Sequence, residues 1–163
     1  MVSCFRFYGG HKNVDPLEIS FRPSVYGIIL MGDNILVAKT KNTGKFALPG
    51  GGIDTEDDPE IALKREVKEE TGVDISVEKF LHFNKNYFYY DPSSDAFDSY
   101  QYFYLCKPLK THLASGAEVD DLEAEDPEWI HIKDLNEKNF QGIEMGILEV
   151  IKRLGNEKSG DHR

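Results

Sequence analysis

The chain has 163 residues, a length that predicts one domain, since domains commonly hold about 100–200 residues. Acidic residues outnumber basic ones by 29 to 19, and the formal net charge is −10. A protein with this negative charge repels the phosphate backbone of nucleic acids and anionic lipids. We therefore expect neither nucleic acid nor a membrane as partner. A small anionic substrate remains compatible with this charge if a metal ion or a local basic patch supplies positive charge.

The two cysteines, Cys4 and Cys106, lie far apart and form no CxxC pair. This usage is typical of reduced thiols in a cytoplasmic protein rather than of a disulfide framework. No apolar run approaches the ~20 residues that a membrane span needs, and no signal peptide is evident at the N-terminus. We expect residues 1–155 to form a single domain and residues 156–163 to be a disordered tail.

The first half of the chain predicts a hairpin followed by a glycine-rich loop. Residues 24–31 and 35–40 are apolar and β-branched, and the turn sequence Gly32-Asp33-Asn34 separates them, which indicates two antiparallel strands. A polar loop over residues 41–45 follows. A short apolar segment then leads into Pro49 and three successive glycines.

A helix is predicted over residues 59–71. Asp58 is a good N-cap, and Pro59 suits the first helical position, where a missing N–H costs nothing. Gly72 marks the C-terminal end.

The second half predicts further strands and a second helix. Residues 75–90, 100–105 and 128–132 are rich in strand-forming side chains, and loops are expected over 91–95 and 111–126.

Apolar residues at helical spacing near the C-terminus predict an amphipathic helix. They are Ile143, Ile147, Val150, Ile151 and Leu154. Strands before, between and after two helices predict an α/β fold, a sandwich with a mixed central sheet.

The predicted first helix carries carboxylates where its apolar face should be. At about 100° per residue, Glu66 and Glu70 fall between Ala62 on one side and Leu63 and Val67 on the other. Like charges four residues apart destabilise a helix, and a hard divalent cation would relieve their repulsion. Mg²⁺ often takes one or two carboxylates plus substrate phosphates, so we expect Mg²⁺, with Mn²⁺ as an alternative. The competing interpretation is a solvated Lys/Glu face.

These residues belong to a longer pattern between Gly51 and Val73. It continues through Arg65-Glu66, Val67 and Glu69-Glu70 to Gly72-Val73. It closely resembles the box of the Nudix hydrolases, the MutT-like pyrophosphohydrolases, and the preceding Phe46-Ala-Leu-Pro-Gly-Gly resembles that family's lead-in. The family's α/β/α sandwich also fits the predicted order of elements.

The single departure from the box is Asp57, where the family pattern has Glu. The resemblance implies that this position supports the box structurally, often by pairing with the Arg that Arg65 matches. Since Asp is one methylene shorter than Glu, we expect the substitution to weaken the pairing with Arg65 and to leave the metal site unchanged.

The resemblance implies hydrolysis of a pyrophosphate bond in a nucleoside diphosphate linked to another group, with a divalent metal assisting the attack of water. It implies metal ligands from the box and the glycine loop, namely Glu66, Glu69, Glu70 and the Gly50 carbonyl. In the family the general base is a box Glu or a Glu from a later loop.

The candidate catalytic residues are accordingly Glu66, Glu69 and Arg65 in the box, with Glu123 and Glu125 as the later carboxylates. The alternative for the last two is an ordinary solvated acidic loop.

Further residues are candidates for substrate binding. Four cations could contact phosphates: Arg22, Lys39, Lys41 and Lys45. Two tyrosines beyond the box, Tyr90 and Tyr102, could stack on a base. The alternatives are surface lysines and core tyrosines.

The expected substrate is a small nucleotide, most simply a nucleoside or deoxynucleoside triphosphate cleaved to the monophosphate and pyrophosphate. A dinucleoside polyphosphate is the alternative, because family members acting on such compounds tend to carry a Tyr at the position of Tyr90. ADP-ribose is disfavoured, because Phe88 and Tyr89 stand where its hydrolases tend to carry a Pro. A nucleotide sensor without activity and a structural interaction domain are further alternatives, but neither explains the box carboxylates. A homodimer stays open.

Overall fold

The computed structural model describes residues 1–54, 56–115 and 124–160. Within these ranges the two α-helices are α1 (Pro59–Thr71) and α2 (Ile147–Gly160). The strands are β1 (Val2–Arg6), β2 (His11–Val14), β3 (Ile19–Met31), β4 (Asn34–Thr40), β5 (Phe46–Ala47), β6 (Gly50–Gly52), β7 (Ile75–Tyr90), β8 (Asp95–Pro108) and β9 (Ala124–His131).

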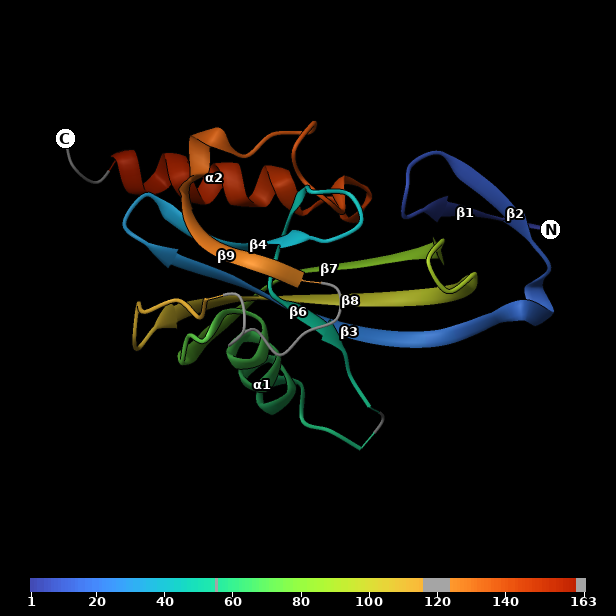
Figure 1. The fold of residues 1–163 in the computed structure, drawn as a ribbon, viewed down its shortest axis with the longest axis horizontal. Helices are drawn as coiled ribbons and strands as arrows, with labels where there is room; N and C mark the ends of the chain where they lie inside the picture. Colours follow the sequence, from blue (N-terminus) through green and yellow to red (C-terminus); the bar gives the residue numbers. More distant parts are fainter. Residues whose placement is uncertain (55, 116–123, 161–163) are drawn as a thin grey trace.

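The described strands form one mixed sheet with the main order β2-β1-β7-β8-β3-β4-β5, while β6 pairs with β3 and β9 with β4. The pairs β1–β7 and β3–β8 are parallel and the others antiparallel. The two α-helices lie on opposite sides of this curled sheet (Figure 1). The predicted α/β class with a mixed central sheet is therefore confirmed.

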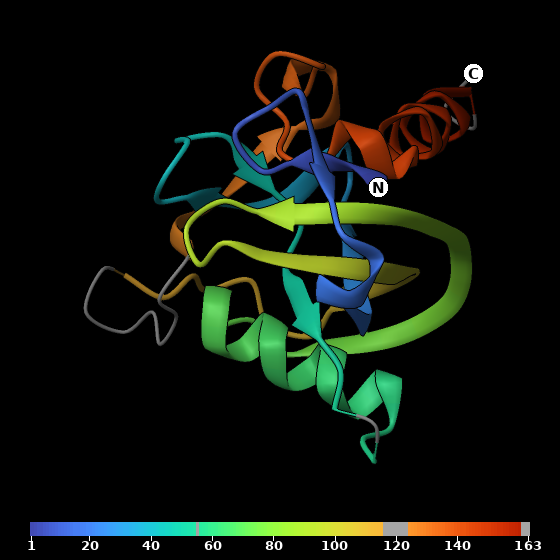
Figure 2. The ribbon, with the colours of Figure 1, turned by 90° about the vertical axis from the view of Figure 1, so that its right-hand side faces the viewer.

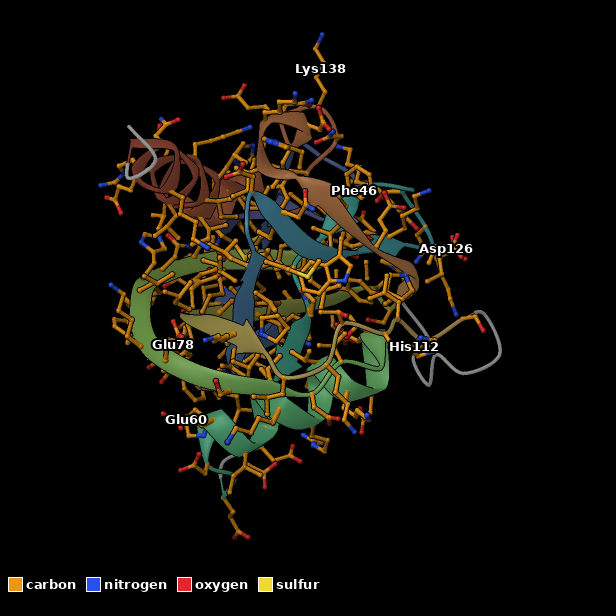
Figure 3. The ribbon with its side chains drawn as sticks, turned by 90° about the vertical axis from the view of Figure 1, so that its left-hand side faces the viewer. Phe46, Glu60, Glu78, His112, Asp126 and Lys138 are labelled. Carbon is orange, nitrogen blue, oxygen red and sulfur yellow. The ribbon has the colours of Figure 1, made fainter. Side chains whose placement is uncertain are left out.

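Strand β3 is apolar throughout its second half because both of its faces are covered. Val25 and Ile29 pack in the cluster that contains the buried residues of α1. Ile28 and Leu30 alternate with them and pack in the cluster that contains α2. Figure 3 shows the two layers apart: Glu60, near the start of α1, and Lys138, which precedes α2, lie on opposite sides of the molecule.

Helix α1 has the predicted bounds, and the predicted caps form. The Asp58 carboxylate accepts hydrogen bonds from the backbone N–H groups of Glu60 at 2.9 Å and Ile61 at 3.2 Å. Gly72 ends the helix in the left-handed region at φ 80°, where glycine is favoured.

Helix α2 differs from its prediction at both ends. Ile143 lies in a separate 3-10 helix, Ile143–Met145, because Gly146 adopts φ 68° and interrupts the helical path. At the other end α2 continues to Gly160, beyond the last residue of the predicted apolar pattern, Leu154. The Lys158 ammonium donates to the carbonyl of Gly32 at 3.4 Å and ties this end to the β3–β4 turn.

Strands β3, β8 and β9 begin earlier than predicted, at Ile19, Asp95 and Ala124. An N-terminal hairpin of β1 and β2, which was not predicted, pairs with the end of β7. Figure 2 shows this hairpin in blue near the turn between β7 and β8, and shows β7 following a wide curve. Register shifts between Val77 and Lys79 and between Phe80 and His82 fit that curve, since bulges bend a strand.

Both cysteines are free and buried. Burial raises the pKa of the Cys106 thiol to about 12, so this thiol stays protonated and unreactive at neutral pH. Among the described residues, no helix is long and apolar enough to cross a membrane.

Candidate functional site

A cleft of about 330 Å³ lies where the glycine strand β6, helix α1 and the sheet meet. This volume falls within the range of small-molecule sites. Its lining includes residues from eight segments of the chain: Phe7, Arg22, Lys39, Gly50, Gly51, Gly52, Glu66, Glu70, Phe88, Tyr90, Ser99, Gln101 and Glu144.

Strand β6 requires glycine because it lies directly against β3. A Cβ on Gly50 would stand 2.1 Å from the carbonyl oxygen of Val25 and 2.7 Å from the Cα of Tyr26. Gly50 also has a φ of 150°, which side-chain-bearing residues rarely adopt. Gly50 thus brings backbone to the cleft wall at a place where no side chain fits.

The carboxylates of α1 meet this glycine strand. The Glu70 carboxylate accepts a hydrogen bond from the N–H of Gly50 at 3.1 Å. The Glu66 carboxylate lies over Gly51, where an added Cβ would be 3.1 Å from its carboxyl carbon. Glu70 is buried and the Glu66 side chain is 17% exposed. The helical wheel therefore placed both residues correctly on the inward face.

The third predicted box ligand stands apart. Glu69 is half-buried and does not line the cleft. Among the described residues, no group of three or more His, Cys, Asp or Glu side chains is arranged to hold a metal. Two carboxylates beside exposed backbone still fit Mg²⁺, which is commonly held by one or two carboxylates together with substrate phosphates.

Two predicted cations reach the cleft. Arg22 lies beside the glycine strand, since a Cβ on Gly52 would be 3.2 Å from its Nε. Lys39 also lines the cleft and is half-buried. They bring positive charge to the cleft that Glu66 also lines.

The other two lysines are exposed in the loop after β4. Lys41 and Lys45 do not line the cleft. Glu125 pairs across β4 and β9 with Lys39 and is half-buried, so it stands at the edge of the site. Glu123 lies outside the described residues.

Arg65 lies between Asp57, the residue that departs from the family's box, and Glu66. Its guanidinium lies 3.9 Å from the Asp57 carboxylate and 3.8 Å from that of Glu66. Asp57 thus retains the expected pairing, at the long distance that its short side chain allows.

The two tyrosines predicted to bind a base separate onto opposite faces of the sheet. Tyr90 lines the cleft. Tyr102 alternates with Gln101 and Phe103, which face the cleft and the α2 core, so its side chain points to the other face. There its ring packs against Phe83 with centroids 5.2 Å apart.

Sequence reasoning missed several cleft residues. Phe88 could have been found, because it stands two residues before Tyr90 on the same strand face. Ser99 and Gln101 form a buried polar floor, which the aromatic character of β8 concealed. Phe7 gave no signal, because its position depends on a hairpin pairing over a long sequence separation.

Glu144 was also missed. It lines the cleft from the 3-10 helix that precedes α2. Burial raises the pKa of its carboxyl above the ordinary value, although its own backbone N–H and the charge of Lys45 oppose this rise.

Residues 20–150 match the family model of the NUDIX domain. The chain belongs to this family. It is 25% identical over 133 residues to a MutT-like protein of Streptomyces ambofaciens, a match that covers 81% of this chain and 78% of the relative. It is also 44% identical over 61 residues to an ADP-ribose pyrophosphatase of Methanocaldococcus jannaschii, but this match covers only 36% of each protein.

A solved structure shares the fold. A NUDIX hydrolase from Nitrosomonas europaea superposes with a TM-score of 0.64 over 83% of this chain and 90% of that chain, at 15% identity. The resemblance drawn from residues 51–73 is thus confirmed. The family acts on pyrophosphate bonds and generally uses divalent metals.

Proposed function

We propose that this Nudix hydrolase cleaves nucleoside and deoxynucleoside triphosphates to the monophosphate and pyrophosphate, with Mg²⁺ as its cofactor. The observation that carries the proposal is the pair Glu66 and Glu70, held inward against the glycine strand in the wall of a cleft. A structural interaction domain would have no use for two inward carboxylates on a helix that packs against the core.

The cation would be held by Glu66 and Glu70, with Glu69 and the Gly50 carbonyl as further candidate ligands. When bound, it would neutralise charge on the diphosphate and lower the pKa of a water molecule. Arg22 and Lys39, which line the same cleft, would hold phosphate oxygens.

Hydrolysis forms a bond from the oxygen of water to phosphorus and breaks the bridging P–O bond. A carboxylate takes the proton of the attacking water. Glu66 and Glu69 in the box, and Glu123 and Glu125 after it, are the proposed candidates for this base. Arg65, paired with Asp57 and Glu66, would position the Glu66 carboxylate.

The substrate is tested with a panel of compounds in the presence of Mg²⁺. It comprises the common ribo- and deoxyribonucleoside triphosphates, a dinucleoside polyphosphate, ADP-ribose and nucleotide sugars, with products resolved by phosphorus NMR. We expect the triphosphates to give monophosphate and pyrophosphate. Exclusive cleavage of the dinucleotide, which the position of Tyr90 keeps as the second candidate, would contradict the triphosphate assignment. Silence across the panel would favour a nucleotide sensor.

A further inference from the structure

The N-terminal hairpin contributes to the cleft although it lies outside the NUDIX match, which begins at residue 20. Phe7 follows directly after β1 and lines the cleft together with Phe88 and Tyr90. The rings of Phe7 and Tyr90 meet edge to face, with centroids 5.0 Å apart.

The backbone of Phe7 is fixed on both sides. Its N–H donates to the carbonyl of Tyr89 at 2.9 Å. Its carbonyl accepts from the side-chain amide of Gln141 at 3.1 Å, and the other end of that amide accepts from the Thr43 hydroxyl at 2.9 Å. Phe7 therefore has a defined place between β7 and the segment that carries Glu144.

The hairpin itself is held to the sheet by charge and by apolar packing. Two guanidinium nitrogens of Arg6 donate to the Asp91 carboxylate at 2.9 Å and 2.6 Å, and the N–H of Tyr8 donates to it at 3.2 Å. Partial burial alone would raise the pKa of Asp91, but these bonds outweigh it and hold the pKa below its ordinary value. Beneath them, Cys4 and Val14 of the hairpin pack in one small core with Tyr89.

The polar floor of the cleft has a fixed orientation. The Gln101 amide nitrogen donates to Asn86 at 3.0 Å and to Ser99 at 2.8 Å, while its oxygen accepts from Asn84 at 2.7 Å. Glu144 lines the same cleft. A carboxyl group is a poor partner for phosphate, but it can hydrogen-bond the amino and imino groups on the edge of a nucleobase.

We propose that the N-terminal hairpin is part of the substrate site, with Phe7, Phe88 and Tyr90 holding the nucleobase and Glu144 bonding its edge. This inference rests on the proposed function. Under this proposal, charged residues of the cleft bind the phosphates and aromatic residues bind the base. Glu66, Glu70 and Arg22 serve the phosphates, and the aromatic rings offer area that any base can use for stacking.

The test compares kinetics on nucleoside triphosphates with kinetics on ribose 5-triphosphate, which has no base. We expect Phe7→Ala to raise KM for the nucleotides about fivefold or more. The KM for ribose 5-triphosphate should stay unchanged, and kcat should change less than KM. Phe5→Ala is the matched control, because Phe5 lies on β1 with its ring against His11 and does not line the cleft. Phe7→Leu keeps apolar bulk without the ring, and melting temperatures of all variants are measured on the same samples.

Glu144 is tested by its effect on base preference. Glu144→Gln should change the ratio of kcat/KM between two nucleotides about tenfold, whereas Glu149→Gln, on the exposed side of α2, should leave the ratio unchanged.

The outcomes separate the two proposals. The proposal of a base pocket is overturned if KM is the same for nucleoside triphosphates and ribose 5-triphosphate and is unchanged in Phe7→Ala and Phe7→Leu. The proposed function would still hold in that case. An absence of hydrolysis for every triphosphate overturns the proposed function and the base pocket with it.

Discussion

The carboxylate of Glu66 lies so close above Gly51 that a Cβ on that glycine would be 3.1 Å from the carboxyl carbon. We therefore expect Gly51→Ala to lower kcat, because the new methyl group displaces the carboxylate that we propose as a ligand of the metal. The free energy of unfolding should change by less than about 1 kcal/mol, since the displaced atoms end a flexible side chain.

Gly50→Ala is the contrasting variant. Its Cβ would meet the backbone of Val25 and Tyr26, which has no room to move, so it should destabilise the fold by more than about 2 kcal/mol. Urea denaturation and kinetics on both variants make the comparison. A Gly51→Ala enzyme with full activity would show that the position of the Glu66 carboxylate is unimportant.

Glu66→Gln and Glu70→Gln should each nearly abolish turnover while the fold remains intact. Glutamine keeps the size of the side chain, and at position 70 it also keeps an oxygen that can accept the Gly50 N–H, but it loses the charge that a hard cation needs. Glu60→Gln, exposed in the first turn of the same helix, is the control. Retention of more than roughly a tenth of the activity, about 1.4 kcal/mol of barrier, would show that the residue is not an essential ligand.

The part of the site that follows from the sequence is local. Capping at Asp58 and Gly72, and the inward side of Glu66 and Glu70, depend on residues within a few turns of one another. These features were predictable, because a helix imposes its own periodicity whatever the rest of the chain does.

The other wall of the cleft depends on contacts between distant segments. Phe7 contacts Tyr90 because β1 pairs in parallel with β7. Glu144 lines the cleft from a short 3-10 helix that lies between two glycines in the left-handed conformation, Gly142 and Gly146. The direction of the Tyr102 side chain could not be predicted for the same reason. Which face of β8 meets the cleft depends on the register of β8 with β3. No periodicity within one segment encodes these choices.

Tyr90→Ala and Tyr102→Ala should consequently behave differently. Tyr90 lines the cleft, so its loss should raise KM by removing a stacking surface worth ~1–3 kcal/mol. Tyr102 packs against Phe83 on the opposite face, so its loss should lower the melting temperature and leave KM alone. Measuring both quantities on the same samples separates the two roles. An increase in KM for Tyr102→Ala alone would contradict this assignment of faces.

Glu144 should make stability depend on pH. Burial raises the pKa of its carboxyl above the ordinary value of 4.5, so the folded protein holds this proton at pH values where the unfolded chain has released it. The contribution of Glu144 is therefore fully present below about pH 4.5 and is lost as the pH rises through the folded pKa. Lys45, the charged group that opposes the shift, reduces the loss without reversing its sign.

Glu144→Gln removes this titration, so the stability of the variant relative to the wild type should increase with pH. Urea denaturation between about pH 4 and about pH 8 measures the difference. Glu149→Gln, exposed on α2, should show a constant difference over the same range. A constant difference for Glu144→Gln would mean that the carboxyl is well solvated, with the wall of the cleft around it more open than the structure shows. A difference that falls with pH would mean that the folded protein stabilises the charged carboxylate, which also contradicts the raised pKa.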